Sequence, residues 1–139
     1  MLQPLANTLA ALGTKRSWVV HGLDGLDEIT LANRTLVAEA TIGGVRTFEI
    51  GPEDFGLRPG TLANLRGGDP KDSARTIREV ISGERRDAAR ALIVINAAAA
   101  LFVGGAAGNL AEARCRAEQS IDEGAAQTKL DELIRATNQ

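Results

Sequence analysis

The chain has 139 residues, of which 44% are hydrophobic and 24% charged, and its formal net charge is −2 at pH 7. At this length folding buries roughly 68–70% of the surface of the unfolded chain, so one domain with a real hydrophobic core is expected. The near-balanced charge provides no basic field for nucleic acid, which excludes that class of partner.

The first predicted element is a short amphipathic helix, because leucines recur at helical spacing in residues 2–12 and Gly13 follows them. Residues 17–22 form a short run with β-branched members that is typical of a buried strand entering a loop at Gly22. Three further strands are predicted over residues 29–31, 35–41 and 45–50, and the Gly43-Gly44 pair favours a tight hairpin before the last of them.

A glycine-rich and proline-containing stretch, residues 51–68, predicts a long ordered loop with about one helical turn, anchored to the core by Phe55 and Leu57. A helix should follow, with Asp69 as its N-cap, Pro70 in its first turn and Gly83 at its end. Its apolar face is expected to consist of Ala74, Ile77 and Ile81.

The most apolar helix is predicted from about residue 87 to residue 103. It is apolar on nearly all sides after Arg90, which indicates burial around its whole circumference at the centre of the core. Its apolar run is interrupted by Asn96 and is shorter than the roughly 20 residues that a membrane-spanning helix needs. A buried Asn96 must find hydrogen-bond partners, and a bond to nearby backbone is favoured over a role in substrate binding.

Two more helices complete the prediction. Asn109 with Glu112 three residues later resembles a capping box, and this helix should end at Gly124. Leu130, Leu133 and Ile134 mark a last helix. Because the strands come mainly first and the helices later, element order alone favours an α+β domain over a regular alternation of strands and helices.

Cysteine usage bears on the compartment. The single cysteine, Cys115, cannot form an internal disulfide, and the chain does not start with a charged and apolar signal segment, so a cytoplasmic protein is expected. Cys115 lies between Arg114 and Arg116, and no partner for nucleophilic catalysis by its thiol is visible in the sequence. Cys115 is therefore interpreted as a residue on a helix face.

Adjacent carboxylates at Asp27 and Glu28 are the main candidate for a metal site, because Mg²⁺ commonly takes one or two carboxylates and fills its other positions with water and phosphate oxygens. Neighbouring side chains on a straight strand point to opposite faces, so both can serve one ion only if the backbone turns, which Gly22 and Gly25 permit. An Asp-Glu pair is common and is by itself a weak signal, usually a solvated turn or helix start.

Nearby polar residues have simpler interpretations. A lone histidine beside apolar neighbours, such as His21 at the end of a strand, is more often a structural hydrogen-bonding residue than a catalytic base. Asp24 precedes a glycine and is interpreted as a turn residue whose carboxylate bonds local backbone, although it could reach a metal through water. No catalytic residue and no organic cofactor site is assigned.

The segment Val19-Val20-His21-Gly22-Leu23-Asp24-Gly25-Leu26-Asp27-Glu28 closely resembles the Val-His-Gly-x-Asp-Gly-Leu-Asp-Glu signature of anthranilate phosphoribosyltransferases. The resemblance covers essentially the whole chain and continues, in the family's order, through Pro52-Glu53-Asp54-Phe55-Gly56-Leu57, Leu65-Arg66-Gly67-Gly68-Asp69 and Asn96-Ala97-Ala98-Ala99-Ala100-Leu101. It implies a magnesium-dependent glycosyltransferase of tryptophan biosynthesis, which transfers phosphoribosyl from phosphoribosyl pyrophosphate to anthranilate and releases pyrophosphate. Asp27 and Glu28 would be its magnesium ligands.

The resemblance also implies that residues 1–139 form the carboxy-terminal part of the family's larger α/β domain, in which a central sheet is flanked by helices. The family's Gly-Thr-Gly-Gly-Asp pyrophosphate loop, its Asn-x-Ser/Thr and Lys-His-Gly-Asn-Arg segments, most anthranilate contacts and the helical domain with the dimer interface have no equivalent here. The chain is therefore expected to be inactive alone and to expose sheet edge and apolar helix surface.

Two alternatives remain open. The chain could be a non-catalytic interaction module, or one that complements a separate amino-terminal half. It could also act on a different substrate, since related nucleoside phosphorylases share the general fold, but the Asp-Gly-Leu-Asp-Glu segment favours the anthranilate branch.

Overall fold

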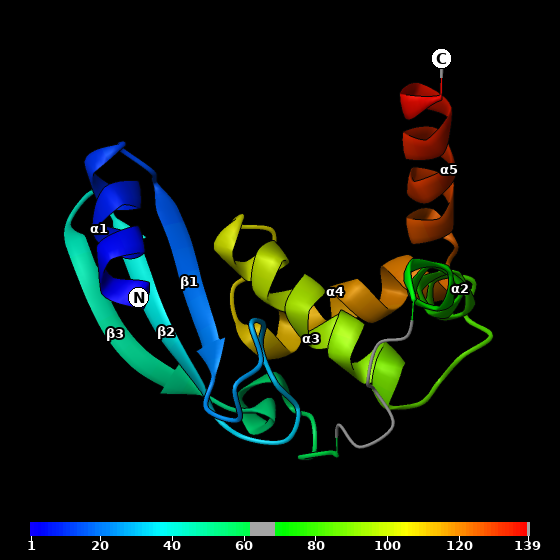
Figure 1. The fold of residues 1–139 in the computed structure, drawn as a ribbon, viewed down its shortest axis with the longest axis horizontal. Helices are drawn as coiled ribbons and strands as arrows, with labels where there is room; N and C mark the ends of the chain where they lie inside the picture. The colour runs from blue at the N-terminus through cyan, green and yellow to red at the C-terminus, as the bar shows by residue number, and fades with distance from the viewer. Residues whose placement is uncertain (62–68, 139) are drawn as a thin grey trace.

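The structure is a computed structural model that describes residues 1–61 and 69–138 (Figure 1). Most of the segment around Leu65 that resembles the family therefore lies outside the described residues. In chain order the elements are α1 (Leu2–Ala11), β1 (Arg16–Gly22), β2 (Thr35–Thr41), β3 (Gly44–Ile50), the short 3-10 helix η1 (Pro52–Phe55), α2 (Pro70–Ile81), α3 (Ala88–Val103), α4 (Leu110–Asp122) and α5 (Ala125–Thr137). None of the described helices has the length and apolarity needed to cross a membrane.

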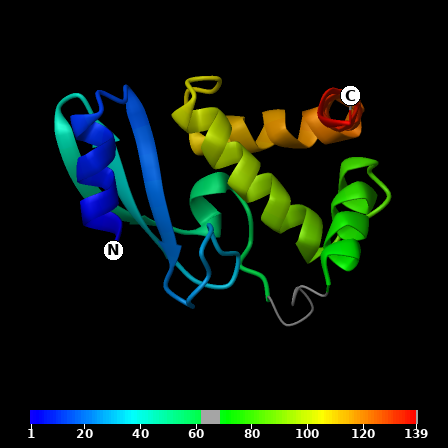
Figure 2. The ribbon, with the colours of Figure 1, turned by 45° about the horizontal axis from the view of Figure 1, so that its top comes forward.

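The three strands form an antiparallel sheet in the order β1-β2-β3, so β2 is central. Helix α1 covers one face of the sheet around the buried Ala38 and Ala40, and the main core on the other face joins Val37 and Phe55 to α3 and α4 (Figures 1 and 2). The predicted mixture of a sheet flanked by helices is confirmed, and so is the hairpin between β2 and β3, where Gly44 has a φ of 117°.

The strand predicted over residues 29–31 is wrong. Ile29 and Leu31 are each only 2% exposed, as a buried strand would be, but their segment pairs with none of the described strands. Its backbone groups bond instead to the side chains of Asn96 and Thr35 and to the amide of Gly60. The apolar run is therefore a buried loop that connects β1 to β2.

The anchoring and capping predictions are confirmed. Phe55, the last residue of the short helix η1, is fully buried, and Leu57 packs against the same core. The Asp69 carboxylate accepts hydrogen bonds from the backbone amides of Lys71 and Asp72 at 2.8 and 2.9 Å, which makes Asp69 the N-cap of α2.

The predicted apolar face of α2 is wrong in part. Val80 is the residue of α2 that is fully buried, whereas Ala74 and Ile77 are exposed and Ile81 is half-buried. The main contacts of α2 with other described elements are light ones with α3 and α5, and most of its residues are exposed or only partly buried (Figure 2).

Helix α3 is central, as predicted, but it is not buried all round by the described residues. Val94, Ile95 and Ala98 lie in the core, while Ile93 and Leu101 are only partly covered. The sheet and α4 cover one face of the helix, and no described element closes the opposite face.

The two last helices differ in how they are held. Asn109 caps α4 by accepting the amide of Glu112 at 2.9 Å, and the Glu112 carboxylate accepts the amide of Gly108. Helix α5 extends away from the other helices and has no buried residue, and Leu133 on it is 59% exposed (Figure 1).

An ion network around the buried Glu39 joins the sheet to α3. The Glu39 side chain, only 5% exposed, accepts hydrogen bonds from Trp18, Arg46 and Arg16 at 2.9, 2.6 and 2.8 Å. The Arg16 guanidinium in turn lies 4.0 Å from the ring centroid of Phe102 on α3. Burial alone would raise the pKa of Glu39, but these three donors outweigh it and lower the pKa to about 2.

Unfolding should therefore depend on pH through Glu39. Its carboxyl has an ordinary pKa of 4.5, so the stabilisation is fully present above pH 4.5 and is lost as the pH falls towards 2. Glu39→Gln should lower the free energy of unfolding by up to about 3 kcal/mol at pH 7 and by much less near pH 2.5, as measured by urea titration. The matched control, Glu49→Gln, removes an exposed pair with Arg34 and should cost less than about 1 kcal/mol. A Glu39→Gln cost that is independent of pH would contradict this account.

Candidate functional site

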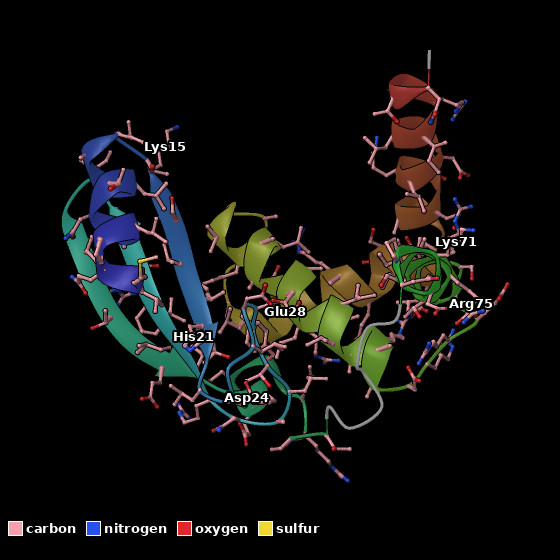
Figure 3. The ribbon with its side chains drawn as sticks, in the orientation of Figure 1. Lys15, His21, Asp24, Glu28, Lys71 and Arg75 are labelled. Carbon is pink, nitrogen blue, oxygen red and sulfur yellow. The ribbon has the colours of Figure 1, made fainter. Side chains whose placement is uncertain are left out.

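The candidate site lies in the loop of residues 23–34 between β1 and β2. His21 lies near the end of β1, Asp24 and Glu28 lie in the loop that follows, and Glu28 is on the α3 side of that loop (Figure 3). The predicted site residues are therefore brought to a single loop that is fixed at both ends by the sheet.

A turn at the end of β1 redirects the chain, as the predicted site required. The amide of Gly22 donates to the carbonyl of Leu26 at 2.8 Å, and the amide of Gly25, whose φ is 95°, donates back to the carbonyl of Gly22 at 2.9 Å. A Cβ at position 22 would lie 2.6 Å from Oδ1 of Asp24 and 3.1 Å from Cβ of Leu26. A side chain at the first position would require Asp24 to move and would crowd Leu26, and a side chain at the second position is strained because φ is positive there.

Asp24 stabilises the loop internally. Its Oδ2 accepts the hydroxyl of Thr30 at 2.6 Å, and its Oδ1 accepts the amide of Leu26 at 3.3 Å. The hydroxyl of the fully buried Thr30 also accepts the amide of Ala32 at 3.0 Å. The interpretation of Asp24 as a turn residue is confirmed, while the part played by Thr30 has no signal in the sequence.

Asn96 fixes the position of the loop against α3. Its Oδ1 accepts the amide of Ile29 and its Nδ2 donates to the carbonyl of the same residue, both at 3.0 Å. Nδ2 also donates to the carbonyl of Leu92 one turn earlier in the helix. The predicted structural role of Asn96 is confirmed, and its main partner is the residue directly after Glu28.

Asp27 and Glu28 are the carboxylates of this loop that remain available. Among the described residues neither carboxylate takes part in a hydrogen bond or an ion pair, although Asp24 in the same turn is fully engaged. Burial raises the pKa of the half-buried Glu28 above its ordinary value, and the negative charge of Asp27 raises it further. The two carboxylates thus repel each other with no described cation to neutralise them.

This donor set fits a hard divalent cation. Two adjacent carboxylates offer the oxygen ligands that Mg²⁺ prefers, and a bound dication would relieve their mutual repulsion. The described residues contain no cluster of three or more acidic, histidine or cysteine side chains that could hold a metal. The protein would therefore supply two ligands, and water and phosphate oxygens would complete the shell. Asp27 and Glu28 as metal ligands stay a prediction.

The remaining candidates do not join this site. His21 is exposed and its side chain forms no hydrogen bond with a described residue, so the structural bond expected for it is not found there. Cys115 is exposed on α4, where its sulfur accepts a hydrogen bond from Nη2 of Arg114 at 3.5 Å, in agreement with a residue on a helix face.

Comparison with known proteins decides the family. The family model described as "Glycosyl transferase family, a/b domain" matches residues 1–127. The chain belongs to this family. An anthranilate phosphoribosyltransferase of Azorhizobium caulinodans is 51% identical over 136 residues, which are 98% of this chain and 39% of that protein. One from Rubrobacter xylanophilus is 47% identical over 98% of this chain and 40% of its own.

Solved structures agree with this assignment. Anthranilate phosphoribosyltransferase from Thermus thermophilus matches with a TM-score of 0.83 and 30% identity, over 94% of this chain and 38% of that chain. A variant of the Saccharomyces cerevisiae enzyme with Mg bound matches with a TM-score of 0.81 and 29% identity, over 93% of this chain and 38% of its own. The chain thus spans about 40% of the length of the curated relatives that it matches.

Proposed function

We propose that this chain, a member of the glycosyltransferase family, forms the magnesium-binding part of the active site of an anthranilate phosphoribosyltransferase. Asp27 and Glu28 are its metal ligands. The observation that carries the proposal is the loop of residues 23–34, in which Asp24 is hydrogen-bonded while the two consecutive carboxylates of Asp27 and Glu28 have no partner among the described residues. The similarity to enzymes of this name supports the choice of substrates, phosphoribosyl pyrophosphate and anthranilate.

The chemistry of the reaction explains why a magnesium site is needed. The bond between the anomeric carbon and pyrophosphate breaks, a bond to the anthranilate amine forms, and the amine releases a proton. Positive charge develops on the ribose and negative charge on the departing pyrophosphate, and Mg²⁺ when bound supplies charge neutralisation for the leaving group. Asp27 and Glu28 would hold the cation, while Asp24, Thr30 and Asn96 keep their loop in place.

The chain matches only about 40% of the length of its relatives, and this bears on its activity in isolation. We infer that residues 1–139 are the carboxy-terminal part of the family's α/β domain and are inactive in isolation, since about 60% of the length of the relatives has no counterpart here. The phosphate loop, the helical domain and the dimer interface belong to that other part. A cytoplasmic location, inferred from the lone Cys115, belongs to the same proposal.

A second candidate function is an interaction module that pairs with a separate amino-terminal half, with or without catalysis. The observation that favours it is the open apolar face of α3, which a partner could cover.

Turnover in a chimera tests the enzymatic proposal. This chain would replace the matching 39% of the Azorhizobium caulinodans relative, and consumption of anthranilate would be followed by its fluorescence with phosphoribosyl pyrophosphate and Mg²⁺. We expect turnover by the chimera and none by the isolated chain. A folded chimera that consumes no anthranilate would refute the proposal. A chimera that instead cleaves nucleosides with phosphate would show that the chain acts as a nucleoside phosphorylase.

A further inference from the structure

A pocket of about 360 Å³ opens between the core-facing side of the sheet and the loop that joins α3 to α4. Three aromatic side chains line it, Trp18 on β1, Phe48 on β3 and Phe102 near the end of α3. The chain has only four aromatic residues, so three of the four gather here, and all three are only partly buried. The pocket therefore offers aromatic surface to a ligand.

Two guanidinium groups flank these rings. Cζ of Arg16 lies 4.0 Å from the ring centroid of Phe102, and Cζ of Arg46 lies 4.9 Å from that of Phe48. Each group donates through Nε to a different oxygen of the buried Glu39 carboxylate, at 2.8 and 2.6 Å. The ring contacts and the shared carboxylate hold both groups in place, so no ordering is required when a ligand binds.

The outer edges of these guanidinium groups are not used by the described residues. Neither Nη1 nor Nη2 of Arg46 forms a hydrogen bond with any of them. Arg16 donates through Nη1 to the carbonyl of Phe102 at 3.4 Å, and its Nη2 forms no hydrogen bond in this part of the chain. A guanidinium whose two terminal nitrogens are free can form two parallel hydrogen bonds with a carboxylate.

The charges around the pocket limit the ligand to a single negative charge. Glu39 offsets one of the two guanidinium charges, since its low pKa keeps it ionised. Asp54 also lines the pocket and offsets the other, although its Oδ2 is engaged by the amide of Gly51 at 2.7 Å. With no broad positive field, a polyphosphate has no advantage here. A single carboxylate on the guanidinium edge of Arg46 suits this balance better.

We propose that this pocket binds a small aromatic carboxylate, with its ring against Trp18 and Phe48 and its carboxylate on the outer edge of Arg46. The pocket shares no lining residue with the loop of residues 23–34. Arg16 opens β1, whereas that loop begins after Gly22, roughly 20 Å further along the strand. The inference does not rest on the proposed reaction, because neither Mg²⁺ nor phosphoribosyl pyrophosphate takes part in the binding.

Titration of this chain with benzoate, followed by tryptophan fluorescence, tests the pocket. Trp18 is the only tryptophan of the chain, so its emission reports on this site. We expect a saturable change with a dissociation constant of about 1 mM or lower, as is usual for a ligand of this size. Acetate lacks the ring and benzamide lacks the charge, so each should bind at least about tenfold more weakly than benzoate.

Arg46→Gln should weaken benzoate binding by at least about tenfold, because it removes the paired donors. The matched control is Arg34→Gln, which removes an exposed guanidinium that is paired with Glu49 outside the pocket and should leave the affinity unchanged. Circular dichroism shows whether each variant is folded.

Asp54→Asn provides a second test if loss of the bond between Arg46 and Glu39 unfolds the chain. An asparagine keeps the oxygen that accepts the amide of Gly51 but removes the opposing charge, so benzoate should bind at least about twofold more tightly. The proposal would be overturned by an unsaturable response, by equal affinity for acetate or benzamide, by equal effects of Arg46→Gln and Arg34→Gln, or by unchanged affinity in Asp54→Asn.

Discussion

Replacing Asp27 by Asn and Glu28 by Gln should lower turnover of phosphoribosyl pyrophosphate by the chimera by at least about 100-fold, the usual cost of removing electrostatic stabilisation from a developing negative charge. The two side chains keep their size, and neither forms a hydrogen bond or ion pair with a described residue, so the fold should be unaffected. Relief of the repulsion that raises the pKa of Glu28 should, if anything, stabilise the chain slightly.

The matched control for this double variant is Glu84→Gln. Glu84 is an exposed carboxylate between α2 and α3, without an ion pair to any described residue. Its replacement changes net charge in the same direction but should leave turnover within about twofold, as expected for a surface substitution. Raising the Mg²⁺ concentration should restore part of the activity of either single variant at the site. Full activity of the double variant at limiting Mg²⁺ would show that the metal is held elsewhere.

Asn96→Leu should lower the free energy of unfolding of this chain by about 2–4 kcal/mol, because each buried backbone group left without a partner costs about 1–3 kcal/mol. The substitution keeps the side-chain volume but deprives both the amide and the carbonyl of Ile29 of their partner. Ile29 is 2% exposed, so water can reach these groups only if the loop moves.

Urea titration of Asn96→Leu measures this cost. The control is Gln119→Leu, which also replaces a side-chain amide by leucine. Gln119 is exposed on α4 and its side-chain amide donates to the Glu123 carboxylate, so its loss should change the free energy of unfolding by less than about 0.5 kcal/mol. In the chimera, Asn96→Leu should also reduce turnover, since Ile29 directly follows Glu28. Equal stability of the two variants would mean that the loop does not depend on Asn96.

Local chemistry made much of this fold predictable. The caps at Asp69 and Asn109 and the turn at Gly22 and Gly25 each follow from side-chain or backbone geometry within a few residues, and the structure has them where the sequence places them. The unengaged carboxylates at Asp27 and Glu28 were also recognisable, because a resemblance over ten consecutive residues singles them out from other Asp-Glu pairs.

Features that depend on distant partners were not predictable. The segment around Ile29 has the composition of a strand, but its hydrogen bonds go to Asn96, 67 residues away, and to a threonine side chain. The burial of α2 and α3 depends on which elements pack against each of their faces. The spacing of apolar residues in the sequence shows an apolar face but not whether another element packs on it. The ionic network around Glu39 likewise joins side chains that only the strand register brings together.

The most direct test of the account is anthranilate consumption by this chain mixed with the unmatched portion of the Azorhizobium caulinodans relative, with and without the Asp27→Asn/Glu28→Gln substitutions. The account predicts no consumption by either piece alone, magnesium-dependent consumption by the mixture, and loss of that activity in the double variant. A mixture that forms a stable, folded complex and still consumes no anthranilate would contradict it.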